Sequence, residues 1–163
     1  GGMMPVEGDG RSTFGSQRGV RRWVFEVQPP RDAGSYARML DQLGIELGAA
    51  FPDGRIVYLS HSGGQAVFRT ADSAAADQRF FATWSRGELQ ELDEELFELA
   101  GLDVARAKVV HLFPESLEQE LARRETAFAG RSADQIHRTW FEIGADGSEF
   151  GISVIRQTGT RTP

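Results

Sequence analysis

The stretch IELGAAFPDGRIVYLS, residues 45–60, decides whether the fold is predicted to be mainly helical or rich in β-strands. Apolar residues alternate over 45–51, which is typical of a strand with one buried face. Pro52-Asp53-Gly54 has the chemistry of a turn, and residues 55–60 are rich in strand-forming side chains. Continuation of the preceding helix is the alternative. Two independent signals, alternation and turn chemistry, favour a hairpin with strands 45–51 and 55–60.

Upstream of this hairpin, the sequence predicts a strand and then a helix. The strand covers residues 20–28, where large apolar side chains alternate until Pro29-Pro30 ends it. The helix begins with Asp32 or Ser35 as its N-cap and ends at Gly44. Its apolar stripe has the helical spacing i, i+3, i+4, i+7 and consists of Tyr36, Met39, Leu40 and Leu43.

Downstream, two more helices are predicted among short strands. The pairs Ser85–Glu88 and Ser116–Gln119 have the spacing of capping boxes, and the second helix stops at Gly101. The third helix, which ends near Gly130, is expected to place Leu117, Leu121 and Phe128 on its inner side. Strands are predicted at 65–70, 79–84, 108–113, 136–143 and 149–157, the last two as a closing hairpin.

This order of elements favours an α+β fold, with a mixed, mainly antiparallel sheet and about three helices packed on it as a two-layer sandwich. We expect a single domain over residues 20–157, a flexible N-terminal segment or linker over 1–19 and a frayed end over 158–163. The tryptophans, Trp23, Trp84 and Trp140, fall in predicted strands and are expected in the core.

Composition excludes several classes of protein. The chain has no cysteine, so disulfides, cysteine-bound metals and a thiol nucleophile are impossible. Its net charge of −6 and pI near 5.1 argue against binding nucleic acid. No apolar run approaches the roughly 20 residues that span a bilayer, so we expect no membrane insertion of this segment. An extracytoplasmic domain of an anchored protein and a cytoplasmic protein remain equally compatible with the sequence.

The histidines are the first candidates for ligand-binding residues. Imidazole can act as a base near neutral pH or bind a metal. No two of the three histidines have the spacing of a helical metal site, so no metal and no cofactor are predicted. His111 in an apolar strand also fits a hydrogen-bonded core histidine, and the turn at 61–64 also fits a plain hairpin turn. The candidates are His61, Ser62, Gly63, Gly64, His111 and His137.

Charged surfaces supply the second group of candidates. The second helix carries a row of carboxylates that can bind a basic partner, although a solvated face is the simpler interpretation. Four arginines near the terminal strands, Arg21, Arg22, Arg138 and Arg156, can form a small basic patch unless neighbouring carboxylates neutralise them. The candidate partner-binding residues are Glu91, Glu94, Glu95 and Glu98.

Two hypotheses follow. The first is a non-enzymatic binding or assembly domain of a larger bacterial-type protein, either membrane-anchored or free, in which an edge strand pairs with a protein partner or a second copy. No catalytic motif is present, which favours this hypothesis, and no catalytic residue is assigned. The second is a small-molecule sensor or enzyme with a histidine–carboxylate pair in a pocket. It requires an imidazole and a carboxylate within hydrogen-bond reach of each other and of a ligand.

Overall fold

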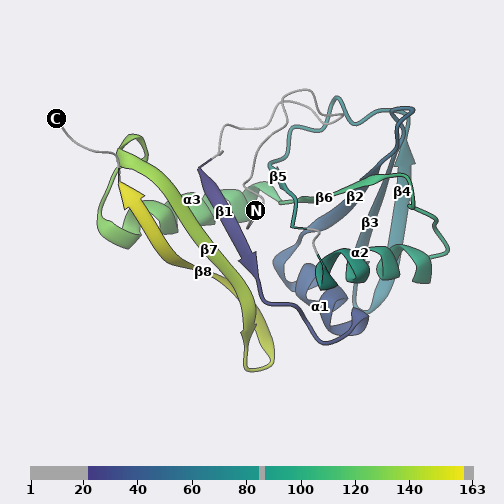
Figure 1. Cartoon of the computed structure of the whole chain (residues 1–163), viewed down its shortest axis with the longest axis horizontal. Coiled ribbons are helices and arrows are strands. Elements are labelled where there is room, and N and C mark those ends of the chain that lie inside the picture. The colour runs from purple at the N-terminus through teal and green to yellow at the C-terminus, as the bar shows by residue number, and fades with distance from the viewer. Residues whose placement is uncertain (1–21, 85–86, 160–163) are drawn as a thin grey trace.

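Two sheets and three helices make up residues 22–84 and 87–159, the part of the chain that the computed structural model describes (Figure 1). The fold is α+β with mainly antiparallel strands, as predicted. The helices are α1 (Ala33–Leu43), α2 (Glu88–Leu99) and α3 (Glu115–Ala129). The strands are β1 (Trp23–Val27), β2 (Glu46–Ala50), β3 (Ile56–Ser62), β4 (Gln65–Ala71), β5 (Phe81–Ala82), β6 (Lys108–Leu112), β7 (Ile136–Asp146) and β8 (Glu149–Gly159).

The larger sheet has the strand order β4-β3-β2-β6-β5 and is antiparallel throughout. The predicted hairpin at 45–60 is confirmed as β2 and β3. It follows α1, whose N-cap Asp32 accepts from the backbone N–H of Ser35 at 2.8 Å. That backbone hydrogen bond stabilises the carboxylate and lowers the pKa of Asp32. Gly44 ends α1 in the left-handed region, at φ 74°, as predicted.

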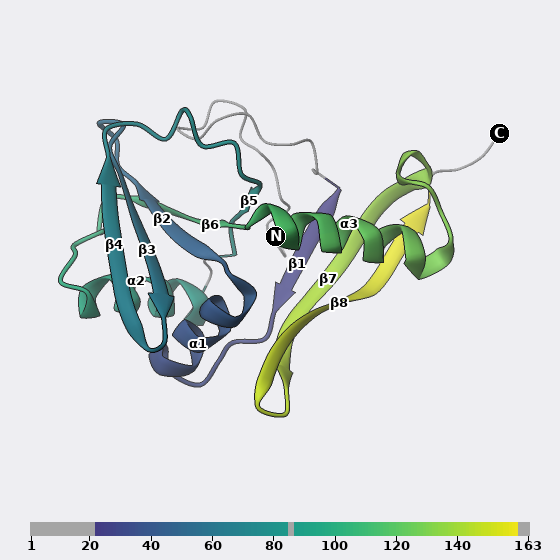
Figure 2. The same cartoon turned by 180° about the vertical axis from the view of Figure 1, so that it is seen from behind.

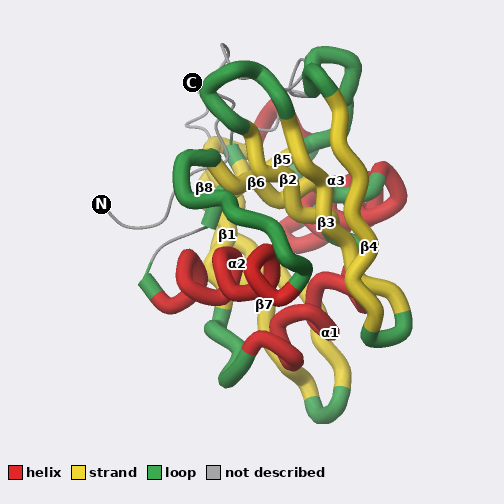
Figure 3. The backbone as a smooth tube through the Cα atoms, turned by 90° about the vertical axis from the view of Figure 1, so that its right-hand side faces the viewer, coloured by secondary structure: helices red, strands yellow, loops and turns green. Residues whose placement is uncertain are grey.

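Each face of the larger sheet is covered differently. Helices α1 and α2 lie on one side of it (Figure 3) and enclose the main core with β2 and β3. The other side carries a smaller apolar cluster, in which Ala74 from the β4–β5 connection packs with Tyr58 and Phe81. Tyr58 also donates from its hydroxyl to Asp77 at 3.0 Å. The β4–β5 connection therefore closes the face that the helices leave open.

The smaller sheet has the order β1-β7-β8 and joins the two ends of the domain. β1 runs parallel to β7, and the similar tripeptides 25–27 and 141–143 lie side by side, with Phe25 opposite Phe141. Figure 2 shows α3 lying along this sheet. Glu125 of α3 is fully buried and accepts two hydrogen bonds of 2.7 Å from the Arg22 guanidinium and one of 2.7 Å from the Thr139 hydroxyl. Arg22 therefore belongs to a partly buried ion pair with Glu125 rather than to a basic patch.

Several local expectations were wrong. α3 starts at Glu115 with Pro114 as N-cap, not in a Ser116–Gln119 capping box. Phe128 is 50% exposed rather than inward. Of the three tryptophans, Trp23 and Trp84 are in the core, whereas Trp140 is half-buried. The guanidinium carbon of Arg156 lies 3.7 Å from the centroid of the Trp140 ring. Trp140 therefore forms a cation–π contact with Arg156 instead of packing in the core.

Some expected boundaries also differ. The strand expected over 79–84 is reduced to the two residues of β5. Upstream of it, Ala74 packs on the sheet. The closing hairpin is longer than expected, and β8 continues to Gly159. Residues 1–19 and Ser85 lie outside the described part of the chain. Among the described residues, no helix is long and apolar enough to cross a membrane.

Candidate functional site

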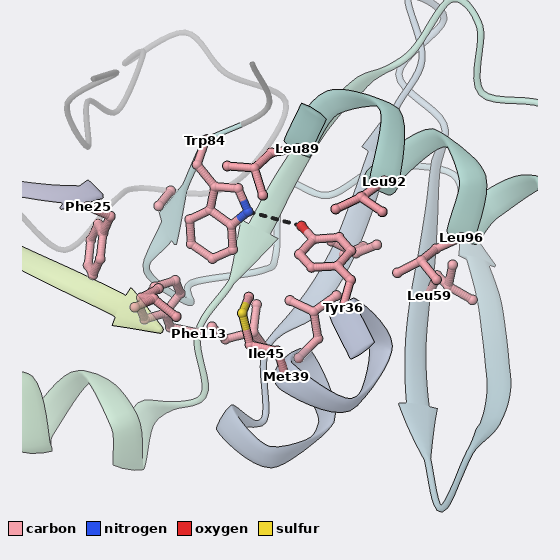
Figure 4. Close-up of a cluster of buried hydrophobic side chains, with 14 of the residues drawn as sticks. Phe25, Tyr36, Met39, Ile45, Leu59, Trp84, Leu89, Leu92, Leu96 and Phe113 are labelled. Carbon is pink, nitrogen blue, oxygen red and sulfur yellow. Dashed lines mark hydrogen bonds between the residues drawn. The ribbon is translucent and has the colours of Figure 1, made fainter. Parts of the chain in front are cut away.

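A group of hydrogen-bonded polar side chains, which we call the buried polar cluster, lies inside the main core. It consists of Tyr36, Trp84, Asp93 and His111, and each is at most 1% exposed. The indole N–H of Trp84 donates to the Tyr36 hydroxyl oxygen at 3.0 Å (Figure 4), and the Tyr36 hydroxyl donates to Oδ1 of Asp93 at 2.5 Å. Burial, with the nearby Asp93 charge, raises the pKa of Tyr36 well above 10.

His111 connects this cluster to the sheet. Its Nδ1 lies 3.1 Å from the carbonyl oxygen of Ala82 and its Nε2 lies 3.0 Å from Oδ2 of Asp93. A carbonyl only accepts, so Nδ1 carries a hydrogen. Nε2 then either donates as part of an imidazolium or accepts a proton held by Asp93, and in both cases one proton lies between the two side chains. The ring stacks on Trp84, with centroids 3.9 Å apart.

The buried polar cluster holds an imidazole–carboxylate pair but gives no ligand access to it. General acid–base catalysis needs one of the two groups to reach the substrate or a bridging water. Asp93 and His111 are both 0% exposed. The cluster instead connects α1, α2 and β6 through hydrogen bonds inside the core, which matches the core-histidine interpretation of His111.

The turn at 61–64 is the two-residue connection of the β3–β4 hairpin. Gly63 and Gly64 have φ values of 58° and 86°, which a type I′ turn requires and which glycine adopts without strain. The Gly63 N–H donates to a carboxylate oxygen of Asp41 at 3.3 Å, so it faces a negative charge rather than an anion site. Ser62 is exposed at the start of this turn.

The three histidines lie in different strands and different surroundings. His61 in β3 is half-buried, and its Nδ1 is buried with no hydrogen-bond partner in the described part of the chain. Burial lowers the pKa of His61, while Asp41 opposes that shift. His137 is exposed near the start of β7, in the other sheet. Within residues 22–84 and 87–159, no group of three His, Asp or Glu side chains is placed to hold a metal ion.

Of the surface hollows lined by described residues, two of moderate size contain no histidine. The larger, about 430 Å³, lies beside the β2–β3 turn between Arg55 and Arg106. The smaller, about 330 Å³, lies on the smaller sheet beside Glu142 and Asp146. The His111–Asp93 pair is therefore not part of either hollow.

The predicted acidic row on α2 is present at the surface. Glu91, Glu95 and Glu98 are exposed and Glu94 is partly exposed, whereas Asp93 points into the core. None of these four glutamates forms an ion pair with a cation among the described residues. Binding of a basic partner by this row stays a prediction.

The outer strand β4 is open along one side. It pairs with β3 alone among the described strands, through a register without a bulge. Residues 65–70 are all exposed, and Val67 and Phe68, on opposite faces, are 54% and 52% exposed. Proteins usually shorten, charge or cover such an edge because it can pair with another chain.

The direction of the backbone groups along β4 follows from its neighbours. The Phe51 N–H donates to the Arg55 carbonyl oxygen. Because backbone groups alternate in direction along an antiparallel strand, residues 57, 59 and 61 of β3 direct their N–H and C=O groups to β2, and residues 56, 58, 60 and 62 direct theirs to β4. Across the β3–β4 register, the residues of β4 that face away from the sheet are Ala66, Phe68 and Thr70. Their N–H and C=O groups form the row that an added strand would use.

Two backbone groups on the outer side of the first half of β8 are occupied by side chains, in contrast to β4. The Phe150 N–H donates to Oε1 of Gln42 at 2.8 Å, and the Arg124 guanidinium donates to the Ile152 carbonyl. Side chains of α1 and α3 therefore occupy backbone groups that another strand would need. β5, the other end of the larger sheet, has only two residues.

Comparison of the chain with protein-family models, with curated proteins and with solved structures found no match. A function therefore has to be inferred from the geometry of the chain itself.

Sequence reasoning missed three parts of this geometry. Asp93 was not singled out from the acidic residues of this helix, although its spacing of i+4 from Leu89 and i−3 from Leu96 puts it on the apolar side. Tyr36 was assigned to the apolar stripe alone, and its hydroxyl gave no signal of a partner. Phe68 was placed in a strand correctly, but nothing local identifies that strand as an outer one.

Proposed function

We propose that this chain is a non-enzymatic protein-binding domain that accepts an extended segment of a partner as an additional strand beside β4. The observation that carries the proposal is the open side of β4, a seven-residue strand with an exposed aromatic residue, Phe68, at its centre. Main-chain hydrogen bonds to Ala66, Phe68 and Thr70 would supply affinity, and side chains on both faces would supply specificity.

The contrast with β8 supports this proposal. Both strands lie at the outer side of a sheet, and both are long enough to attract another chain. Gln42 and Arg124 occupy backbone groups of β8, whereas no described side chain hydrogen-bonds to the outward groups of β4. The alternative of catalysis by His111 and Asp93 has less support, because burial separates both groups from any substrate.

Peptide selection followed by amide hydrogen exchange tests this proposal. Random short peptides are selected against the purified chain, and exchange is measured with and without the selected peptides. We expect slower exchange at the amides of Ala66, Phe68 and Thr70. Failure to select peptides, or protection confined to other segments, would contradict strand addition at β4.

Two variants and one control sharpen this test. Thr70→Pro removes an outward N–H without removing a β3–β4 hydrogen bond, and Phe68→Ser removes the exposed aromatic surface. We expect each to weaken peptide binding by about tenfold or more, which corresponds to a loss of about 1.4 kcal/mol in binding free energy. Ile155→Ser, which changes an exposed apolar residue of β8 in the other sheet, should leave binding unchanged. Equal weakening by all three variants would argue against the proposal.

A further inference from the structure

We propose that the hollow of about 430 Å³ beside the β2–β3 turn binds a small zwitterion of the amino-acid type with an apolar side chain. This inference goes beyond strand addition at β4 and does not depend on it. It rests on a lining that combines two guanidinium groups, two carboxylates and an apolar wall, and on charges that are not paired with one another inside the chain.

The register of the larger sheet brings the two walls of the hollow together. Ala50, the last residue of β2, pairs with Ile56 of β3 on one side and with Lys108, the first residue of β6, on the other. The β2–β3 turn, residues 51–55, and the α2–β6 connection, residues 100–107, therefore leave the sheet next to each other. The hollow lies between these two segments.

Each wall holds one aspartate in a fixed orientation. Oδ1 of Asp53 accepts from the Arg55 N–H at 2.9 Å, and Oδ1 of Asp103 accepts from the Ala105 N–H at 3.0 Å. Such turns fix an aspartate side chain to the backbone two residues further on. Neither carboxylate forms an ion pair with a cation of residues 22–84 or 87–159. The negative charge of each is therefore left for a ligand.

The two arginines of the lining also lack a counter-ion inside the chain. Arg55 and Arg106 are exposed, and neither pairs with a carboxylate in the part of the chain that the structure describes. The guanidinium carbon of Arg55 lies 4.5 Å from the centroid of the Phe51 ring, a contact that orients this side chain. A guanidinium presents its N–H donors in a plane that matches a carboxylate. The two arginines can therefore receive the carboxylate of a ligand.

The balance of charges favours a zwitterion over a simple anion. An oxyanion attracted by the two arginines would also approach the two aspartates, whose charges oppose it. A molecule with a carboxylate and an ammonium group offers the opposite charge to both pairs. The rest of the lining, Phe51, Pro52 and Ala105, provides an apolar surface for the side chain of the ligand. The volume lies in the range of about 300–1,000 Å³ that is usual for small-molecule sites.

Titrations with three related small molecules, followed by amide NMR of the intact chain, test this inference. L-phenylalanine carries both charges, N-acetyl-L-phenylalanine lacks the ammonium group, and phenethylamine lacks the carboxylate. We expect L-phenylalanine to bind with a dissociation constant of about 1 mM, as is usual for a ligand of this size. Each analogue should bind about threefold more weakly or worse. The amides of Arg55 and Ala105 should shift most, because they donate to the aspartates that the ammonium group contacts.

Two variants assign the charges of the ligand to the side chains of the hollow. Arg106→Gln removes a guanidinium, and Asp103→Asn removes a carboxylate charge while its oxygen can still accept from the Ala105 N–H. We expect each to weaken L-phenylalanine by about threefold, as for one exposed ion pair. Asp103→Asn should not weaken N-acetyl-L-phenylalanine, which has no ammonium group. The control variants Arg31→Gln and Asp146→Asn, at exposed positions outside the lining, should leave all affinities unchanged.

Three outcomes would overturn the inference. Equal affinities for L-phenylalanine and N-acetyl-L-phenylalanine would show an anion site instead of a zwitterion site. Absence of shifts at Arg55 and Ala105 with all three molecules, or equal effects of the hollow variants and the controls, would show that the hollow is not a binding site. The protection of β4 by selected peptides is measured separately, so strand addition stands or fails independently of these results.

Discussion

Nε2 of His111 lies 3.0 Å from Oδ2 of Asp93, and neither side chain is exposed to solvent. A buried ion pair or proton-sharing pair is costly to break, because removal of one partner leaves the other buried without compensation. The relationship therefore predicts stability effects rather than effects on catalysis.

Replacement of Asp93 should separate loss of the pair from loss of its charge. We expect Asp93→Ala to lower the free energy of unfolding by about 3–5 kcal/mol. Asp93→Asn should cost about 1–2 kcal/mol, because its oxygen can still accept from Tyr36 and its amide can donate to a neutral His111. Urea unfolding of both variants measures this order. A smaller loss of unfolding free energy in Asp93→Ala than in Asp93→Asn would contradict this order.

Two glutamates of α3 offer a matched comparison of buried and exposed ion pairs. Glu125 is fully buried against Arg22, whereas Glu120 contacts Arg123 and Arg124 near the surface. We expect Glu125→Ala to cost about 3–5 kcal/mol of unfolding free energy and Glu120→Ala less than about 1 kcal/mol. Equal costs in urea unfolding would show that Glu125 does not fasten α3 to the smaller sheet.

The two tyrosines should titrate late in the folded chain. Burial, with Asp77 nearby, raises the pKa of Tyr58 to about 12, and that of Tyr36 is also raised well above 10. The unfolded chain releases these protons near pH 10, so stability is retained below pH 10 and falls as the pH rises towards 12. Ultraviolet absorbance should show little tyrosinate at pH 10.5 in the folded chain. The urea-unfolded chain should show ionisation of both tyrosines at that pH. Substantial tyrosinate in the folded chain at that pH would contradict the burial of these hydroxyls.

His61 should make the chain less stable in mild acid. Burial lowers the pKa of His61 below 6.5, so the unfolded chain binds that proton first as the pH falls. Stability present above pH 6.5 is therefore lost towards pH 5. We expect His61→Gln to reduce this loss, measured as the shift of the thermal midpoint between pH 7.5 and 5. His137→Gln, at an exposed position, should behave like the parent chain, and an equal effect of both variants would contradict a specific role for His61.

The elements that could be predicted from the sequence are those with local signals. Alternation and a turn identified the hairpin at 45–60, and Gly44 marked the end of α1 because its backbone adopts the left-handed region. The pairing of β1 with β7 could not be predicted, because it joins segments far apart in the sequence and either tripeptide alone indicates only a strand.

Polar residues on inner faces account for the errors in the helices. The buried residues of α3 are Glu118, Leu121 and Glu125. Because two of these are charged, the apolar residues alone did not identify the buried side of the helix, and Phe128 was wrongly assigned to it. In the same way, Asp93 is buried because Tyr36 and His111 bind it. The open side of β4 depends on strand order, which the composition of 65–70 does not encode.

The parallel pairing of β1 with β7 has a consequence for how the chain acquires its structure during synthesis. β1 leaves the ribosome first, but β7, its one strand partner in the described part of the chain, follows only after α3. Until then Trp23 and Phe25 lack Phe141, on which both rings pack. Contacts between distant segments form slowly, so completion of this domain should wait for the arrival of its last hairpin.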